Sequence, residues 1–195
     1  TSWTCFYDVI NRCNLVIDRA PKVAEKDPLY LESDVRATIA EVTALRALSY
    51  FYLVRAFKNV PYYTGVITTD DQRLDYPATD GDQIIRTLLS DLNAVLPDAL
   101  QIYPMKNGRD ISYGRITRNA IYALMADMSL WIGDFENAAL YSQKVIDDKL
   151  DMFKREGLTY ILQLSNNYPI LPDNTSTYGK YSAFNETFGS DGGGL

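Results

Sequence analysis

The chain has 195 residues, of which 47% are apolar and 23% charged, and its formal net charge is −6. These values are ordinary for a globular protein with a packed core, and an acidic chain without a stripe of Lys and Arg argues against nucleic acid as a partner. The sequence contains no histidine, which removes the commonest general base and the commonest metal ligand.

The first predicted helix includes Trp3. Apolar and aromatic residues recur there in steps of three and four up to Ile17, which is the period of an amphipathic helix. We expect this helix to stop near Ala20-Pro21, because proline interrupts helical hydrogen bonding. The chain opens inside this pattern and without Met, so we expect its N-terminal end to be a cut within a longer protein.

The second predicted helix begins between Pro28 and Asp34 and runs to about Phe57. Pro28 suits a first helical turn, and Ser33 is the alternative as a capping residue. The interior of this helix is rich in alanine, and small side chains allow a neighbouring helix to approach closely. The alanines are Ala37, Ala40, Ala44 and Ala47.

Two long loops flank a third predicted helix. Residues 58–78 lack a helical period and contain Pro61, Gly65 and Pro77, so we expect a loop. A helix should follow Thr79-Asp80, with an apolar stripe that reaches Leu96. Residues 97–116 are rich in Pro, Gly and Asn and predict a second loop.

The last two predicted helices form a hairpin. Thr117 is expected to cap a helix that runs to Ile132, and Gly133 is expected to end it in the left-handed conformation. Asp134 then caps a fifth helix, from Phe135 to about Asp147. We expect the two helices to pack antiparallel on either side of the glycine.

The spacing of Gly133, Phe135 and Ala138 resembles the tetratricopeptide pattern. In such a hairpin the aromatic ring fills the gap between the two helices, and the alanine marks their closest contact. Strict 34-residue periodicity is absent, so the sequence does not predict a plain repeat array. Residues 165–195 are rich in Asn, Ser, Thr, Gly and Tyr and predict an irregular segment that ends in a second cut.

Four segments, in their order and approximate spacing, resemble one family, SusD/RagB. They are Trp3-x3-Tyr7-x2-Ile10-x3-Asn14, then Glu41-Val42-Thr43-Ala44-Leu45-Arg46-Ala47 with Tyr50-Phe51-x-Leu53-Val54, then Phe57-x2-Val60-Pro61-Tyr62, and finally Gly114-Arg115-Ile116-Thr117 leading to Gly133-Asp134-Phe135-x2-Ala138. Together they extend over residues 3–140. Two glycines of the family pattern are replaced, one by Ala40 and one by Lys58, at positions of helix packing and helix ending.

The resemblance implies an all-α fold of tetratricopeptide-like helical hairpins with long loop insertions. It implies that residues 1–150 form the SusD-like helical scaffold and that residues 151–195 begin the irregular, loop-rich segment of the same domain, in a chain truncated at both ends. It also implies a non-enzymatic protein, lipid-anchored at the surface of the outer membrane by an anchor outside this sequence. Such a protein binds a glycan or other oligomeric nutrient and hands it over to a TonB-dependent (SusC-like) outer-membrane transporter.

No catalytic arrangement is evident among the polar residues. The acidic clusters, such as Asp70-Asp71 and Asp147-Asp148, fall in predicted loops or caps, whereas a glycosidase needs two carboxylates opposed across a cleft. Glu41 and Arg46 lie on an apolar helix, and we expect them to pair with each other's neighbours or with backbone, since burying either alone is costly. We therefore predict no catalytic residue, no metal site and no cofactor.

The unusual component is tyrosine, with fifteen residues, of which about half fall in predicted loops. Tyrosine offers a flat apolar face and a hydroxyl, which suits sugars because their rings have apolar C–H faces rimmed by hydroxyls. The alternative, that these rings only pack loops onto helices, stays open for each residue. Tyr76, Tyr103 and Tyr113 are the candidate ligand-binding residues. Trp131 is expected in the core, and Trp3 in the packing of the first helical pair.

Two alternative functions remain open for this sequence. A generic tetratricopeptide scaffold that binds a protein or peptide is disfavoured by the long tyrosine-rich loops and by the four ordered segments. A glycoside hydrolase domain is disfavoured by the lack of histidine and of an opposed carboxylate pair.

Overall fold

The computed structural model describes residues 3–69, 72, 76–104 and 111–155, and the chain divides into two compact units, Thr1–Ala139 and Leu140–Leu195. The described residues form five α-helices and one pair of two-residue strands, which confirms the predicted all-α class. The predicted irregular segment from residue 165 onward lies outside the described residues. The boundary predicted near residue 150 stays a prediction.

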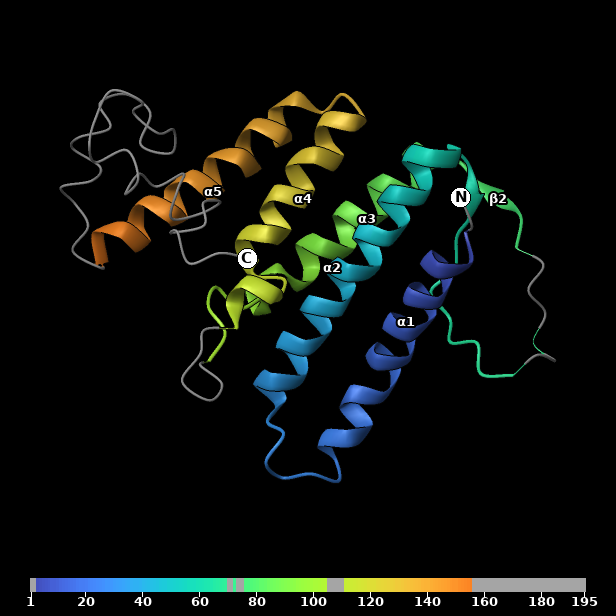
Figure 1. The fold of residues 1–195 in the computed structure, drawn as a ribbon, viewed down its shortest axis with the longest axis horizontal. Helices are drawn as coiled ribbons and strands as arrows, with labels where there is room; N and C mark the ends of the chain where they lie inside the picture. The colour runs from blue at the N-terminus through green and yellow to red at the C-terminus, as the bar shows by residue number, and fades with distance from the viewer. Residues whose placement is uncertain (1–2, 70–71, 73–75, 105–110, 156–195) are drawn as a thin grey trace, which may run out of the picture. The chain divides into compact units, whose positions relative to one another are not determined.

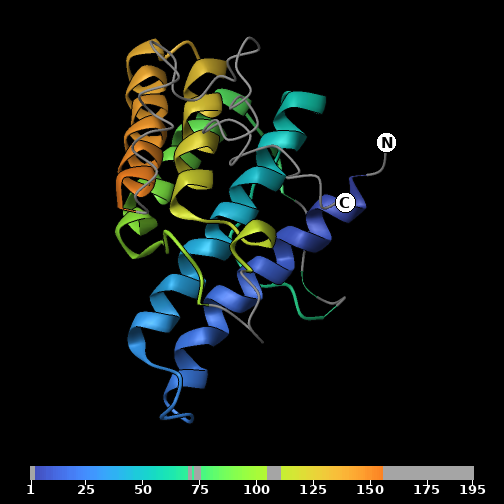
Figure 2. The ribbon, with the colours of Figure 1, turned by 60° about the vertical axis from the view of Figure 1, so that its left-hand side comes forward.

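Four helices of the first unit lie next to one another in chain order (Figures 1 and 2). They are α1 (Thr4–Ala24), α2 (Glu32–Phe57), α3 (Gly81–Val95) and α4 (Arg118–Trp131). Helix α2 packs against α1 on one side and α3 on the other, and α4 continues the array beyond α3. Their buried apolar side chains form the core, and the largest fully buried ones are Tyr50, Phe51, Ile10, Leu53, Ile84, Ile85, Leu88, Leu92, Ile121, Met125 and Met128.

Helix α1 continues past the proline that was expected to end it. Pro21 lies inside α1, which ends at Ala24, so the predicted stop at Ala20-Pro21 is wrong. A proline removes the one backbone hydrogen bond that its own nitrogen would donate, while later residues can still donate. The N–H of Glu25 accordingly donates to the carbonyl of Pro21 at 3.2 Å.

The start of α2 depends on a residue that the sequence did not single out. Helix α2 begins at Glu32, and neither Pro28 nor Ser33 caps it. Instead the carboxylate of Asp34 accepts a hydrogen bond from the backbone N–H of Leu31 at 3.2 Å, which is half of a capping box. The predicted small-residue face is confirmed, since all four alanines are buried: Ala37, Ala40, Ala44 and Ala47.

The two ends of the loop between α2 and α3 lie next to each other. Strand β1 (Val60–Pro61) pairs antiparallel with β2 (Ala78–Thr79), where the sequence predicted only loop. The pairing arises because α3 starts beside the end of α2, so both ends of the intervening loop meet there. Asp80 caps α3, since its Oδ1 accepts a hydrogen bond from the N–H of Gln83 at 3.1 Å.

A strained residue ends α2. Lys58 has φ +67° and ψ −73°, and the N–H of Asn59 donates across it to the carbonyl of Phe57 at 2.9 Å. This is a γ-turn with positive φ, which is rare and unfavourable for a residue with a Cβ atom. Lys58 is also one of the two positions where the family pattern has glycine.

Replacing Lys58 with glycine is expected to raise the free energy of unfolding by about 1 kcal/mol, because relief of the strained backbone outweighs the extra freedom of glycine in the unfolded chain. Urea denaturation followed by circular dichroism measures the change. Lys58→Ala is the matched control, because it removes the same charge and keeps the Cβ atom. An equal gain in Lys58→Ala would attribute the effect to the charge and contradict the strain.

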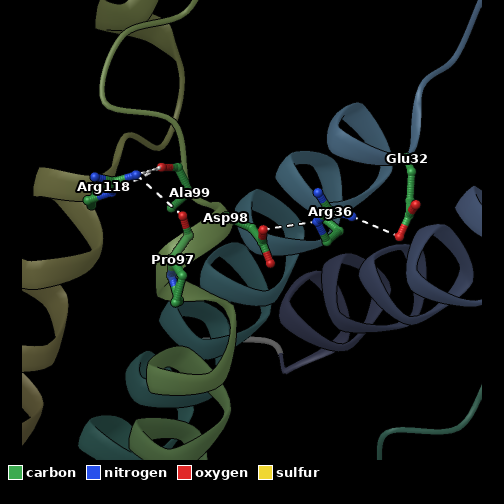
Figure 3. A network of polar contacts seen from close by, with 6 residues as sticks. All are labelled: Glu32, Arg36, Pro97, Asp98, Ala99 and Arg118. Atoms are coloured by element: carbon green, nitrogen blue, oxygen red, sulfur yellow. Dashed lines mark hydrogen bonds and ion pairs between the residues drawn. The ribbon is translucent and has the colours of Figure 1, made fainter.

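The loop between α3 and α4 is fastened by arginines. It contains the 3-10 turns η1 (Leu96–Asp98) and η2 (Ser112–Gly114). Figure 3 shows Arg118, the first residue of α4, donating to the carbonyls of Pro97 and Ala99, and Arg36 of α2 bridging Glu32 and Asp98. The Arg36 pairs are exposed, so each contributes little on its own. Together these contacts fix the end of α3 against the starts of α2 and α4.

The turn after α4 has the predicted chemistry. Thr117 caps α4, since its hydroxyl accepts from the N–H of Ala120 at 3.4 Å, and Gly133 has φ +76°. Asp134 caps the next helix by accepting from the N–H of Asn137 at 3.2 Å and from its side-chain amide at 2.7 Å. These two hydrogen bonds also lower the pKa of Asp134.

Helix α5 (Phe135–Arg155) extends beyond the predicted end at Asp147. It continues because no glycine or proline interrupts the sequence before Gly157. Ala138 is buried, as expected for a residue at a helix contact, whereas Phe135 is exposed, so the prediction that its ring fills the gap between helices is wrong. The antiparallel packing of α4 and α5 stays a prediction.

Candidate functional site

One face of α1 holds the first long loop by its backbone. The hydroxyl of Tyr7 donates to the carbonyl of Pro61 at 2.8 Å. One turn later, the side-chain amide of Asn11 donates to the carbonyl of Ile67 at 2.8 Å and accepts from its N–H at 2.9 Å. The amide of Asn14 donates to the carbonyl of Gly65 at 2.9 Å. Residues 7, 11 and 14 share one face because their spacing is that of a helix.

Tyr50 of α2 also holds this loop by its backbone. Its hydroxyl donates to the carbonyl of Tyr63 at 2.7 Å and accepts from the N–H of the same residue at 3.0 Å. The loop segment from Pro61 to Ile67 is therefore fixed at four of its residues by side chains of α1 and α2. These hydrogen bonds hold the backbone of the segment in place.

Five aromatic rings form a stack that runs from the end of α2 to the far side of the loop. The order is Phe57, Trp3, Tyr7, Tyr63 and Tyr76, with centroid separations of 5.0, 6.4, 5.8 and 5.0 Å and interplanar angles between 11° and 28°. Such offset stacking is favourable between aromatic rings. We call this set the aromatic stack.

Burial makes several tyrosines in and beside the aromatic stack less acidic. Burial, followed by the nearby Tyr63, raises the pKa of Tyr7 to about 12, and burial also raises the pKa of Tyr50, Tyr62 and Tyr63. These hydroxyls keep their protons in the folded protein at pH values where an unfolded tyrosine, with a pKa near 10, loses them.

The stability of the protein should therefore be constant up to about pH 10 and fall as the pH rises toward 12, since the unfolded state releases tyrosine protons that the folded state retains. Thermal unfolding followed by circular dichroism from pH 8 to 12 measures this. Tyr7→Phe should reduce the steepness of the fall. A melting temperature that is unchanged up to pH 12 would contradict the assignment.

A buried arginine connects three helices behind the loop. Arg46 of α2 donates to Oδ1 of Asn14 on α1 at 2.9 Å and pairs with Asp91 on α3 at 3.3 Å. The side chain of Arg46 is only 9% exposed, so these partners offset the cost of burying its charge. Arg46 is paired, as expected of a buried charge, but its partners are side chains of α1 and α3 and not the neighbours of Glu41 or the backbone.

Glu41 fastens the second long loop in the same manner. Both carboxylate oxygens of Glu41 accept hydrogen bonds from the guanidinium of Arg115, 74 residues later. That guanidinium lies 4.2 Å from the ring centroid of Tyr103, and the hydroxyl of Tyr103 donates to the carbonyl of Ile116 at 2.9 Å. The predicted structural role of Glu41 is confirmed, and its partner is in the Gly114-Arg115-Ile116-Thr117 motif.

The candidate residues Tyr76 and Tyr103 lie in different places. Tyr103 is 6% exposed beside Glu41, whereas Tyr76 is 38% exposed at the end of the aromatic stack. The surroundings of Tyr103 include Glu41 of α2, and those of Tyr76 include Tyr50 of α2. These two α2 residues lie roughly 13 Å apart along the helix. The side chain of Tyr113 lies outside what the structure describes. A ligand-binding role for each of the three stays a prediction.

The sequence assigned one of the two tryptophans wrongly and the other correctly. Trp131 is exposed, with its ring edge-on to Phe51 and beside Arg55, so its expected place in the core is wrong. Trp3 stacks on Phe57 of α2, as expected, yet it remains partly exposed. The four-residue spacing of Trp3, Tyr7 and Asn11 is the sequence signal from which their common face on the first helix could have been predicted.

Metal-binding clusters and membrane-spanning helices are both absent from the described part of the chain. No group of three or more Asp, Glu or Cys residues in residues 3–69, 72, 76–104 and 111–155 is arranged to hold a metal ion. Over the same ranges, no helix combines the length and the apolar character that crossing a membrane requires.

Comparison with known sequences gives a consistent picture, although no family model matches the chain. SusD-like protein P25 of Formosa agariphila is 30% identical over 103 residues, which is 53% of this chain and 19% of that protein. SusD-like protein P38 of the same organism is 25% identical over 142 residues, or 72% of this chain and 25% of that protein. The chain thus spans about a fifth to a quarter of the length of these relatives.

Solved structures extend the similarity to the fold. A SusD superfamily protein from Bacteroides thetaiotaomicron matches with a TM-score of 0.68 and 28% identity, over 76% of this chain and 34% of that one. A laminarin-binding SusD-like protein gives 0.63 and 29%, over 73% and 29% of the two chains. Surface glycan-binding protein A from Bacteroides uniformis gives 0.63 and 25%, over 74% and 31%.

Proposed function

We propose that this chain, which belongs to the SusD-like family, is the helical part of a protein that binds a carbohydrate and does not cleave it. The observation behind the proposal is the match over about three quarters of the chain to SusD-like proteins, two of which are described as binding laminarin and as a surface glycan-binding protein. The aromatic stack, which includes Tyr63 of the fixed loop segment, supplies chemistry suited to sugars, since ring faces pack against apolar C–H surfaces.

The finer part of the proposal concerns place and partner. The family resemblance implies a lipid-anchored protein at the outer-membrane surface that passes its ligand to a TonB-dependent (SusC-like) transporter. A binding protein in this position needs affinity and release rather than chemistry. Fixed loops meet this need, because a site that is ordered in advance loses little entropy when it binds.

The charged residues of the described ranges support binding over hydrolysis. Carboxylates on the helices form ion pairs with arginines: Asp91 with Arg46, Glu41 with Arg115, Asp98 with Arg36, and Asp127 with Arg55. A hydrolase would instead use two carboxylates facing a shared sugar. These residues fasten helices and loops to one another.

The test is calorimetry of the protein with a panel of neutral and charged glycans, at low and at high salt, together with chromatography of the glycan after long incubation. We expect binding that changes little with salt, because salt screens mainly exposed charges, and no shortening of the glycan. Shorter sugars whose appearance is abolished by replacing one Asp or Glu would establish a hydrolase. Binding only to peptides, with steep salt dependence, would establish the generic scaffold.

A further inference from the structure

We infer that Trp131, Arg55 and Asp127 form a binding site for a neutral sugar ring between α2 and α4. This site shares no residue with the aromatic stack. The inference rests on the proposed function, since it assumes a carbohydrate ligand. It adds a second place where a sugar binds, the residues that contact it there, and the chemical class of the sugar.

Each of the two helices contributes one aromatic and one charged side chain to the site. Phe51 and Arg55 lie one turn apart on α2, and Asp127 and Trp131 lie one turn apart on α4, a spacing that places both members of each pair on one helix face. The guanidinium of Arg55 donates to the carboxylate of Asp127 at 3.2 Å, and the ring centroids of Phe51 and Trp131 are 6.1 Å apart. The four side chains therefore form one cluster that joins the two helices.

Arg55 contacts both aromatic rings of this cluster. Its guanidinium carbon lies 5.2 Å from the ring centroid of Phe51 and 5.5 Å from that of Trp131. Contacts of this kind between a guanidinium and an aromatic face are favourable. Together with the ion pair to Asp127, they hold the arginine in one orientation, so less entropy is lost when a ligand binds to it.

The cluster is open to solvent although each of its members has a partner. Trp131 is 48% exposed, and the side chains of Arg55 and Asp127 are 45% and 53% exposed. An ion pair as exposed as this one contributes little to stability, so the attachment of α4 to α2 does not by itself account for the arrangement. Exposed tryptophan and arginine side chains that lie together are typical of binding sites.

The chemistry of the cluster fits a neutral sugar. The indole ring of Trp131 offers an apolar surface to the C–H face of a sugar ring. Arg55 has N–H donors beyond the one that Asp127 accepts, and a carboxylate accepts through two oxygens, so neighbouring sugar hydroxyls find a donor and an acceptor side by side. A charged ligand gains little from the pair, because an anion that approaches Arg55 also approaches Asp127.

The experiment is a calorimetric titration of the full chain with a panel of neutral glycans that includes laminarin. We expect Trp131→Ala to weaken binding of a glycan that binds the wild type roughly tenfold, as loss of a central aromatic contact does. Arg55→Met keeps the apolar stem of the side chain and removes its donors, and should weaken binding about fivefold. Circular dichroism confirms that each variant is folded.

The matched control is Tyr52→Ala. Tyr52 directly follows Phe51 and is an exposed aromatic residue of the same helix, but its ring stacks on Phe6 of α1 at 6.1 Å. It therefore lies outside the cluster, and the affinity of Tyr52→Ala should equal that of the wild type.

The fluorescence of Trp131 provides a direct readout of contact. The chain has two tryptophans, so Trp131 is the single one in a Trp3→Phe variant, which keeps an aromatic ring at position 3. A sugar that packs on the indole removes water from it, and the emission should shift to shorter wavelength at the glycan concentrations where calorimetry of the same variant detects binding.

The outcomes separate this site from the proposed function. If no glycan of the panel binds the wild type, both fall. If a glycan binds and either Trp131→Ala or Arg55→Met binds it as tightly as the wild type does, only this site falls. It also falls if Tyr52→Ala weakens binding as much as Trp131→Ala does, or if the emission of Trp131 stays unchanged while the glycan binds.

Discussion

Replacing Asn14 with alanine is expected to lower the free energy of unfolding by about 3 kcal/mol, because the buried guanidinium of Arg46 loses one of its two partners and the carbonyl of Gly65 loses its donor. Asn14 is 2% exposed. Its oxygen accepts from the guanidinium of Arg46, and its nitrogen donates to the carbonyl of Gly65. Alanine removes both contacts, and the buried Arg46 then keeps only its ion pair with Asp91.

Asn11→Ala is the matched control for this prediction. Asn11 lies on the same face of α1, makes two hydrogen bonds to the same loop and is only partly buried. Water can replace its contacts, so the expected loss is about 1 kcal/mol. Urea denaturation of the two variants compares them directly. Equal losses would show that burial and the charge of Arg46 make no difference at Asn14.

The second large effect is expected at Gly81, the first residue of α3. A Cβ atom there would lie 2.3 Å from the backbone oxygen of Lys58 and 2.8 Å from Cγ1 of Val54. The first of these is a backbone atom at the end of another helix, so it cannot rotate away. We expect Gly81→Ala to lower the free energy of unfolding by about 2–3 kcal/mol through overpacking, although alanine is otherwise the better helix former.

Gly114→Ala separates this clash from the general effect of removing a glycine. A Cβ atom at Gly114 meets nothing within 4 Å, so this variant should unfold at the wild-type urea concentration or slightly above it. Denaturation midpoints of the two variants, measured side by side, provide the comparison. A Gly81→Ala protein as stable as Gly114→Ala would mean that α2 and α3 are further apart at this point.

The sequence predicted the features whose causes are local. The helix after Thr117, the reversal at Gly133 and the cap at Asp134 each depend on residues within one turn of the chain, and each is present. Local rules were less reliable where two of them competed. Pro21 was expected to end α1, but a proline one turn from a helix end removes only one hydrogen bond.

Contacts between distant segments could not be derived in this way. Glu41 was expected to have a partner, but nothing in its neighbourhood identifies Arg115, 74 residues away. The burial of Tyr103 depends on that pair. From the sequence alone, this buried loop tyrosine therefore could not be distinguished from an exposed one. The close approach at Gly81 likewise depends on where α2 ends, which no pattern around Gly81 records.

The way α1 and α2 hold the first loop has a consequence for evolution and for engineering. The hydrogen bonds that Tyr7, Asn11, Asn14 and Tyr50 form with that loop all go to its backbone atoms. Every amino acid provides the same carbonyl, and every one except proline provides the same N–H. The identities of the loop side chains can therefore change while the attachment is kept, so residues between Tyr62 and Val66 can be exchanged on the same helical frame.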